Sequence, residues 1–162
     1  MSEKCLIAEF SNSEKFRTAI EVLETGDFTM DEVSIVTHAA DENLAELRQV
    51  TEVNENALSS EKTTAASTLA GGTLGAALGT MTMMGPMLVA GPIVGMAAGA
   101  VGGSLLSAVS RWGVEHDVAA QYETKVREGS VLIIVTGDAI RVDEAAAMLR
   151  TVPPTSLEQF DK

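Results

Sequence analysis

The sequence has one cysteine and few basic residues, and each shortage excludes a class of protein or partner. Cys5 has no second cysteine to pair with, so a disulfide within the chain is ruled out. Lys and Arg number 11 against 23 Asp and Glu, which gives a net charge of −12. The phosphates of nucleic acid need basic patches, and the sequence shows none. We therefore expect no nucleic-acid partner.

Side chains that could carry chemistry are scarce too. With two histidines and one cysteine, the sequence shows no pair of nucleophile and base, and we predict that the protein is not an enzyme. It has no G-x-G-x-x-G motif, and no Lys-Ser or Lys-Thr pair follows the glycines, so no phosphate-binding loop is expected. His38 lies near Asp41 and Glu42, but this set is more typical of a solvated turn than of a metal site. We predict no catalytic, cofactor-binding or metal-ligating residues.

Charged side chains and histidine are missing from the 48 residues between Thr63 and Ser110, which we call the uncharged run. The uncharged run contains no aromatic residue either, while both of its flanks are acidic. The chain has the length of about one domain, so one folded unit with one insertion is the simplest partition. The first residues show no basic leader with an apolar core, so no cleaved secretion signal is indicated and the cytoplasm is the expected compartment.

Glycine recurs at every fourth position in two parts of the uncharged run. Residues four apart nearly stack on a helix, so each series gives a smooth groove that another helix can approach closely. The sequence therefore predicts a helix-packing interface. Its residues are Gly71, Gly75 and Gly79 in the first series and Gly91, Gly95, Gly99 and Gly103 in the second.

The uncharged run divides into two segments, Thr63 to Met84 and Pro92 to Ser110, each close to the ~20 residues that cross a bilayer as a helix. The tip between them, Met83 to Pro92, has no polar side chain that would favour water, so we expect a helical hairpin with a buried tip. The predicted hairpin turn consists of Gly85, Pro86, Gly91 and Pro92. Arg111 and Trp112 follow the second segment, as a basic residue and an indole would at a membrane interface.

Lipid and protein are both suitable surroundings for such a hairpin. One expectation is association with the inner membrane. The acidic flanks would be repelled by an anionic leaflet, so the alternative is a soluble homo-oligomeric ring, shell or filament with the hairpins buried in a shared core. Burial within one monomer is least expected, because 48 apolar residues exceed what the flanks can cover. A small-molecule sensor is a further alternative, and it would need a pocket with convergent polar groups.

The flank before the uncharged run predicts a strand, a helix and a second strand. Residues 4–10 are mostly apolar, and Ser11 and Glu14 have the spacing of a capping box that would begin a helix. Gly26 is placed to end this helix, and the β-branched stretch 33–37 predicts the second strand. The apolar face of the helix would consist of Phe16, Ala19, Ile20 and Leu23.

The flank after the uncharged run predicts a helix, a strand, a second helix and a second strand. Apolar side chains of the first helix repeat every four residues at Val114, Val118, Tyr122 and Val126. Gly129 would end that helix, and residues 131–135 are apolar on both faces, as a central strand would be. Asp138 could cap the last helix, and residues 155–160 could form a closing edge strand.

These elements predict an α+β fold, a ferredoxin-like pattern of two strand-helix-strand halves interrupted by a glycine-zipper helical hairpin. Residues 1–62 would hold the first half, with a short helix over 41–50 and a tether over 51–62. Residues 63–112 would form the hairpin, and residues 113–162 a helix and the second half. Because both halves must meet in one sheet, both ends of the hairpin must emerge on the same side.

Motifs in and after the uncharged run follow a known pattern. They are Met84-Gly85-Pro86, Ala90-Gly91-Pro92, the glycine zipper, Trp112-Gly113-Val114 and the segment from Ala119 to Leu132. This pattern resembles the bacterial YflT-type family of heat-induced and general stress proteins. The resemblance implies a small protein with a stress context and a poorly defined biochemical role, often described as a membrane protein, and it assigns no catalytic residue.

The leading hypothesis is a non-enzymatic, stress-associated protein without a cofactor. It would associate with itself, attach to a lipid bilayer, or do both, through the glycine-zipper hairpin.

Overall fold

The computed structural model describes residues 3–29, 31–38, 82–84, 87–90 and 109–161 of the chain. Its elements follow in the order β1 (Glu3–Phe10), α1 (Ser13–Thr25), β2 (Val33–His38), β3 (Thr82–Met84), β4 (Met87–Ala90), η2 (Ser110–Trp112), α6 (His116–Arg127), β5 (Val131–Asp138), α7 (Ala139–Leu149) and β6 (Ser156–Asp161). η2 is a single 3-10 turn. The two flanks therefore contain the strands and helices predicted for residues 4–37 and 114–160, at nearly the predicted bounds.

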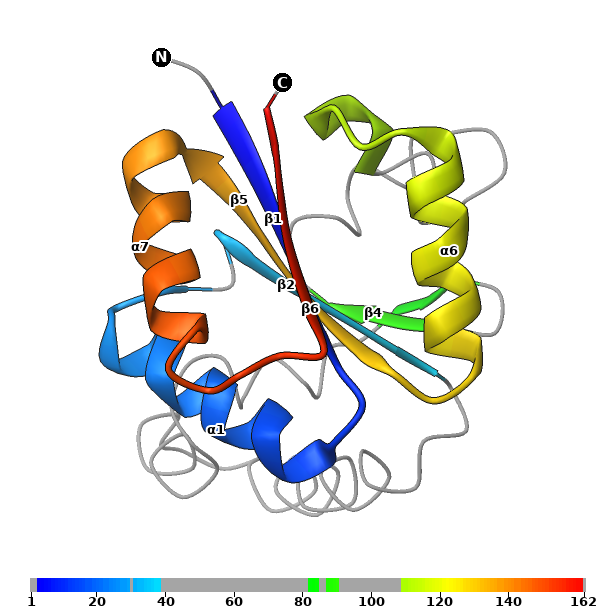
Figure 1. Ribbon diagram of the computed structural model, residues 1–162, viewed down its shortest axis with the longest axis horizontal. Coiled ribbons are helices and arrows are strands. Elements are labelled where there is room, and N and C mark those ends of the chain that lie inside the picture. The colour runs from blue at the N-terminus through cyan, green and yellow to red at the C-terminus, as the bar shows by residue number, and fades with distance from the viewer. Residues whose placement is uncertain (1–2, 30, 39–81, 85–86, 91–108, 162) are drawn as a thin grey trace, which may run out of the picture.

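The strands of the described residues join one antiparallel sheet in the order β3-β4-β2-β5-β1-β6 (Figure 1). β1 pairs with β5 along its whole length, and β5 separates it from β2. The segments before and after the uncharged run therefore interleave in a single sheet. This confirms the predicted α+β architecture, and β5 is a central strand with buried residues on both faces, as its apolar sequence predicts.

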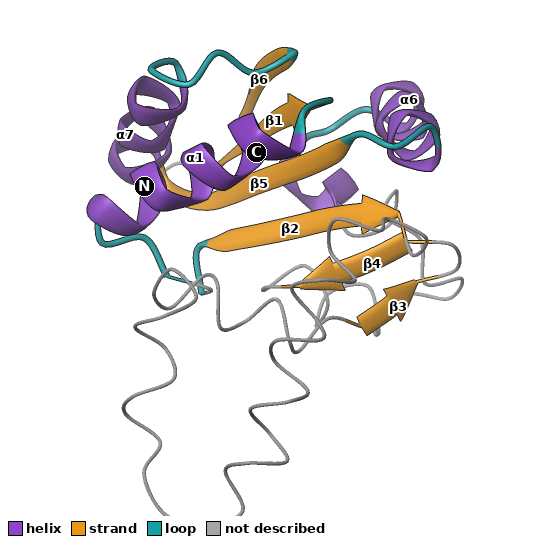
Figure 2. Ribbon diagram, turned by 90° about the horizontal axis from the view of Figure 1, so that it is seen from below, coloured by secondary structure: helices purple, strands orange, loops and turns teal. Residues whose placement is uncertain are grey.

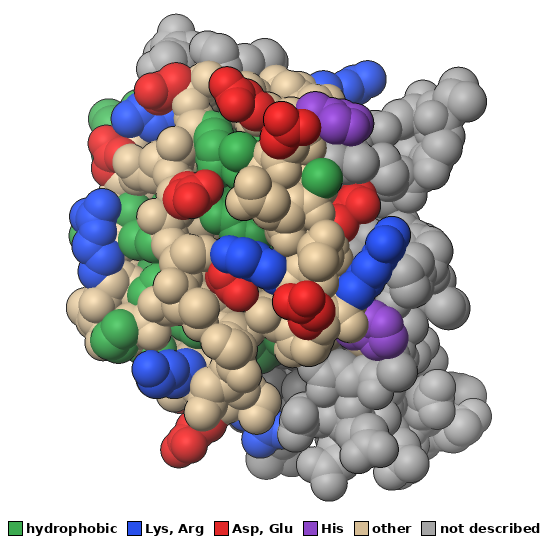
Figure 3. All heavy atoms as spheres, turned by 45° about the vertical axis from the view of Figure 1, so that its right-hand side comes forward, with side chains coloured by type: hydrophobic (Ala, Val, Ile, Leu, Met, Phe, Trp, Pro, Cys, Tyr) green, Lys and Arg blue, Asp and Glu red, His purple; other side chains and the backbone are tan. Residues whose placement is uncertain are grey.

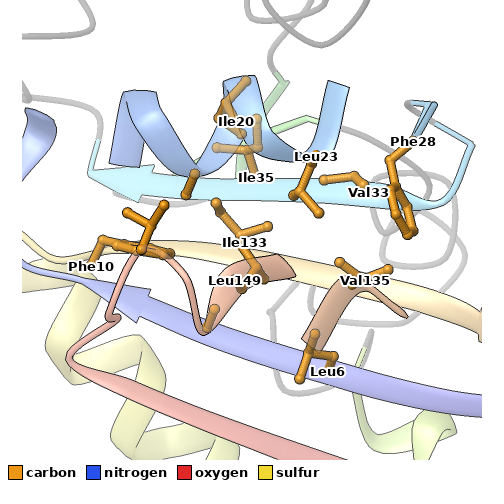
Figure 4. Close-up of a cluster of buried hydrophobic side chains, with 14 of the residues drawn as sticks. Leu6, Phe10, Ile20, Leu23, Phe28, Val33, Ile35, Ile133, Val135 and Leu149 are labelled. Carbon is orange, nitrogen blue, oxygen red and sulfur yellow. The ribbon is translucent and has the colours of Figure 1, made fainter. Parts of the chain in front are cut away.

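Helices cover both faces of the sheet, with α1 and α7 on one side and α6 on the other (Figure 1). Successive residues of a strand point to opposite faces, so β1 and β5 each contribute to two cores. The core under α1 and α7 includes Leu6, Phe10, Ile20, Leu23, Phe28, Val33, Ile35, Ile133, Val135 and Leu149 (Figure 4). The core under α6 and η2 consists of Cys5, Ile7, Val36, Val109, Trp112, Val114, Ala119, Tyr122, Val126, Leu132 and Ile134.

The start of α1 differs from the predicted capping box. Asn12 caps the helix, because its side-chain oxygen accepts from the backbone N–H groups of Glu14 at 2.8 Å and Lys15 at 3.1 Å. Ser11 instead lies with its hydroxyl 2.6 Å from that of Thr155, just before β6. Asparagine caps as well as serine does, so a contact distant in sequence moved the helix start by one residue. The predicted apolar face of α1 is buried and confirmed.

The end of α1 lies at Gly26, as predicted, but the left-handed residue that follows it is Asp27, with φ of 57°. The N–H of Phe28 donates to the carbonyl of Leu23 at 3.1 Å, and that of Asp27 donates to Glu24 at 3.0 Å. These two hydrogen bonds form a Schellman motif. They turn the chain so that the Phe28 ring enters the core under α1 and α7.

Gly129 ends α6 through the same motif, which confirms its predicted role. Its φ is 107°, its N–H donates to Val126 at 3.1 Å, and the N–H of Ser130 donates to Lys125 at 3.0 Å. A side chain at this φ would meet its own backbone, although nothing else lies within 4 Å of the position where a Cβ would stand.

We expect Gly129→Ala to lower the free energy of unfolding by about 1–2 kcal/mol, because alanine at positive φ is strained. Gly137→Ala is the matched control: Gly137 lies in β5, has no positive φ and has nothing within 4 Å of the place that a Cβ would take, so a change within about 0.5 kcal/mol is expected. Urea unfolding of both variants measures the difference. Equal effects of the two substitutions would contradict this reading of the α6 terminus.

The helical hairpin predicted for the uncharged run does not extend through its middle. Thr82–Met84 is a strand, although the first predicted helix extended to Met84. Met87–Ala90 is also a strand, although these residues were expected in the buried tip of the hairpin. β4 pairs with β2 and β3 pairs with β4, side by side in Figure 2. Without β4, β2 would present unpaired backbone groups at the edge of the described sheet. Pairing that edge outweighs the helical preference of methionine and leucine.

Candidate functional site

Glu9 in β1 is the most buried charged residue in the described part of the chain, with 4% of its surface exposed. Its carboxylate accepts hydrogen bonds from Lys125 Nζ at 2.7 Å, Ser130 Oγ at 3.0 Å and Ser156 Oγ at 3.0 Å. We call these four residues the Glu9 cluster. The cluster lies on the face of the sheet that α6 covers.

Backbone geometry brings the members of the Glu9 cluster together. Glu9 and Ser156 are directly opposite each other in the pairing of β1 with β6. Lys125 lies in the last turn of α6, and the Schellman motif at Gly129 returns Ser130 toward the same end of the sheet. The cluster therefore ties β1, α6, β6 and the turn before β5 to one carboxylate.

Electrostatics favour the ionised form of Glu9. Burial by itself opposes ionisation, but the hydrogen bonds from Lys125, Ser130 and Ser156 and the positive charge of Lys125 outweigh it. The pKa of Glu9 is therefore lowered below its ordinary value. The Lys125 side chain is 38% exposed, so solvent weakens its share of the attraction.

This arrangement limits what Glu9 can do chemically. A carboxylate that is ionised at neutral pH and accepts from three donors is a weak base, because proton uptake would break its hydrogen bonds. The Glu9 cluster is therefore suited to holding the sheet and α6 together. The same network holds Ser130 and Ser156, which point their hydroxyls at Glu9.

Tyr122 lies beside the Glu9 cluster, with the Lys125 ammonium 5.2 Å from the centre of its ring. The whole Tyr122 side chain is buried, the hydroxyl included. The hydroxyl finds no hydrogen-bond partner among the described residues. Burial raises the pKa of Tyr122 well above its ordinary value, with Ser156 and Glu158 as the nearby polar groups.

A second polar cluster surrounds Arg141 in α7. Its guanidinium makes a two-pronged ion pair with Glu32, with Nε 2.8 Å from Oε1 and an Nη 3.1 Å from Oε2. It also donates to the backbone carbonyl of Asp27 at 3.1 Å and lies 3.8 Å from the centre of the Phe28 ring. The hydrogen bond from Arg141 is the main cause of a lowered pKa of Glu32. Arg141 therefore clamps the turn after α1 against α7.

The C-terminal end of the uncharged run enters the core under α6. Val109 is 1% exposed, and Trp112 in η2 is 9% exposed and packs in the same cluster as Val114 and Tyr122. The indole of Trp112, which the sequence predicts as an anchor at a membrane interface, is therefore held in the protein core of the described structure. Arg111, the other predicted anchor, is exposed.

All of the predicted packing and turn residues lie outside the described residues. They are Gly71, Gly75, Gly79, Gly85, Pro86, Gly91, Pro92, Gly95, Gly99 and Gly103. Gly85 and Pro86 stand between Met84 and Met87, which are opposite each other in the pairing of β3 with β4. The helix-packing interface and the hairpin turn therefore remain predictions.

The described residues hold no group of three His, Cys, Asp or Glu side chains that could bind a metal ion. Of the set considered at the end of β2, His38 is described, and Asp41 and Glu42 are not. In the same part of the chain, no helix combines the length and the apolar composition needed to cross a membrane.

Sequence reasoning missed both polar clusters. The signal for the first was available, since Glu9 is the one charge in the apolar stretch Leu6 to Phe10. A glutamate within a predicted buried strand needs a partner. No pattern pointed to Arg141 and Glu32, which are 109 residues apart in sequence and meet only because β2 and β5 pair in the sheet.

Comparisons with known proteins identify a family but no activity. No curated protein and no solved structure matched the chain. Residues 68–159 match the family described as "Protein of unknown function (DUF1269)". That description names no activity, so the resemblance to YflT-type stress proteins stays a prediction. Because the match spans more than half of the 162 residues, the chain belongs to the DUF1269 family.

Proposed function

We propose that this protein is a non-enzymatic, stress-associated protein that associates with itself, with the uncharged run buried between copies of the chain. The acidic α+β domain would carry the uncharged run and keep the assembly soluble in the cytoplasm. Attachment to a lipid bilayer through the same residues is the alternative.

The proposed fold of the domain is ferredoxin-like. Two strand-helix-strand halves, β1-α1-β2 and β5-α7-β6, interleave in the order β2-β5-β1-β6 with all neighbours antiparallel. This order supports the proposal, because it is the one that two such halves adopt in a ferredoxin-like sheet. α6 and the pair β3-β4 would be additions to it.

The observation that carries the proposed self-association is that the domain's own helices already cover both faces of the sheet. α1 and α7 bury one face, and α6 and η2 bury the other. Among the described residues, Ile140 is the one large hydrophobic side chain that is exposed. Figure 3 likewise shows hydrophobic atoms reaching one face of the molecule in small groups between charged side chains. Little of the described domain is left to cover the rest of the uncharged run, so other copies or lipid would have to cover it.

The pairing of β4 with β2 favours copies of the chain over lipid. It ties Met87–Ala90, in the middle of the uncharged run, to the domain's own sheet. A hairpin inserted in a bilayer would need those residues at its far end, away from the sheet. The net charge of −12 also opposes approach to an anionic membrane surface.

Replacing Gly95 and Gly99 together by leucine is expected to reduce the mass of the assembly, because leucine side chains would fill the groove that lets helices approach. The matched control is Ile93→Leu with Val101→Leu, because a helix over the same segment would place these two residues on the side opposite the glycines. Light scattering of detergent-free protein measures the mass of each variant. An unchanged mass in the glycine variant would remove the glycine series from the proposal.

A further inference from the structure

β6 is an outer strand of the described sheet and has β1 as its one neighbour there. Its sequence, Ser-Leu-Glu-Gln-Phe-Asp, contains neither proline nor lysine, which proteins commonly use to block an open edge. α7 packs mainly on β1 and β5, and α6 packs mainly on β2 and β5. α7 reaches β6 through Asp143, which accepts a hydrogen bond from the Gln159 side chain at 3.2 Å, while Glu158, Gln159 and Asp161 of β6 are exposed. Leu157 and Phe160 are partly buried, each against a different core. A further strand beside β6 would cover both side chains.

Hydrogen bonding within the sheet determines which backbone groups of β6 point outward. The N–H of Thr136 in β5 donates to the carbonyl of Glu32 at 2.9 Å, so the backbone groups of Thr136 point toward β2. Backbone groups of successive residues point to opposite edges of a strand, so the N–H and C=O groups of the odd-numbered residues of β5 point toward β1. In the register of β1 with β5, the even-numbered residues of β1 are opposite the odd-numbered residues of β5, so their backbone groups point toward β5. The backbone groups of the odd-numbered residues of β1 therefore point toward β6. The carbonyl of Glu9, which accepts from Thr155 at 2.7 Å, agrees with this assignment. The outward backbone groups of β6 therefore belong to Leu157, Gln159 and Asp161.

One antiparallel register with a second copy satisfies all of these outward groups. It places Gln159 opposite Gln159 of the other copy, and Leu157 opposite Asp161. Each acid then lies opposite an apolar residue, because Glu158 falls opposite Phe160. A shift by one step would place Glu158 opposite itself, where like charges repel, and would leave the groups of Asp161 unpaired within the strand.

We propose that β6 pairs antiparallel with β6 of a second copy, around a two-fold axis at Gln159, to join two sheets into one. This interface uses no residue of the uncharged run, so it is a second surface for self-association and does not depend on the proposed function. A contact made by a single short strand is small beside the interfaces of stable complexes, so the dimer forms and dissociates with concentration.

A cysteine at position 159 tests the register directly. Directly opposed residues in a hydrogen-bonded pair have Cα atoms about 5.5 Å apart, within the range that a disulfide spans. The native Cys5 is fully buried and burial raises its pKa to about 12, so it contributes little background. Gln121→Cys, at an exposed position of α6, is the matched control. In a glutathione buffer at about 0.15 M salt, where the Debye length is about 8 Å, we expect several-fold more disulfide-linked dimer from Gln159→Cys than from Gln121→Cys.

Proline at the same position supplies an independent readout. Gln159→Pro removes an outward N–H while leaving the pairing of β6 with β1 intact, and Gln159→Ala keeps that N–H. In sedimentation over a range of concentrations, the alanine variant should form the edge dimer and the proline variant should not. Both measurements are repeated with Gly95→Leu and Gly99→Leu present, where cross-linking at position 159 should persist. Equal cross-linking at positions 159 and 121 would overturn the β6 interface, and so would equal dimerisation of the proline and alanine variants. Neither outcome depends on what the glycine variant shows about the uncharged run.

Discussion

Replacing Glu9 by glutamine is expected to lower the free energy of unfolding by about 2–3 kcal/mol. The amide would lose the negative charge that pairs with Lys125, and its NH2 group would donate where a carboxylate oxygen now accepts from a serine, in a site where Glu9 is 4% exposed. The loss stays below that of a fully buried ion pair because the Lys125 side chain is 38% exposed. Chemical denaturation at pH 7 measures it. Glu21→Gln, at an exposed position of α1, is the control and should change stability by less than about 0.5 kcal/mol.

The pH dependence of the same variant separates the ion pair from a simple packing defect. The pKa of Glu9 is lowered in the folded state, so its contribution is complete above the unfolded value of about 4.3 and is lost as the pH falls through the lower, folded value. Wild type should therefore lose more stability than Glu9→Gln between about pH 5 and pH 3. Glu32, whose pKa is also lowered, should keep part of the acid sensitivity in both proteins. Parallel pH profiles would contradict the assigned charge state of Glu9.

Arg141→Ala is expected to lower the free energy of unfolding by about 2 kcal/mol, the second largest effect. The change removes the two-pronged pair with Glu32, the bond to the carbonyl of Asp27 and the contact with the Phe28 ring. The side chains of Arg141 and Glu32 are 28% and 27% exposed, which keeps the loss moderate.

Arg141→Lys distinguishes the geometry of the clamp from its charge. A lysine ammonium keeps the positive charge but cannot bind both oxygens of Glu32 and stack on Phe28 at the same time. Denaturant titrations should therefore show that lysine restores less than half of the stability that alanine loses. Full restoration by lysine would show that charge alone holds the turn after α1.

The flanking elements could be predicted because local patterns and final packing agree there. The buried face of α1 repeats with helical period, the apolar stretch 131–135 became the central strand, and Gly129 took the left-handed position that ends α6. Where the predictions failed, contacts distant in sequence decided the outcome. Ser11 is held by Thr155, so Asn12 caps the helix in its place.

The uncharged run shows the limit of periodicity most clearly. Its apolar sequence predicts a helix as far as Met84 and a buried tip over residues 83–92, yet Thr82–Met84 is a strand and Met87–Ala90 pairs with β2. The open edge of β2 is a property of the assembled sheet and not of the local sequence. The position of Trp112 after an apolar segment is typical of a residue at a membrane interface, but its indole packs in the core under α6. The Glu9 cluster depends likewise on four segments that meet only after β1, β5 and β6 have paired.

The mass of the detergent-free, full-length protein, measured by light scattering beside a liposome flotation assay, tests self-association most directly. We predict a particle several times the 16.9 kDa of one chain that does not float with liposomes. Flotation would favour lipid as the cover of the uncharged run. A monodisperse 16.9 kDa monomer that does not bind liposomes would contradict both burial between copies and burial in lipid. The uncharged run would then be covered by its own chain alone.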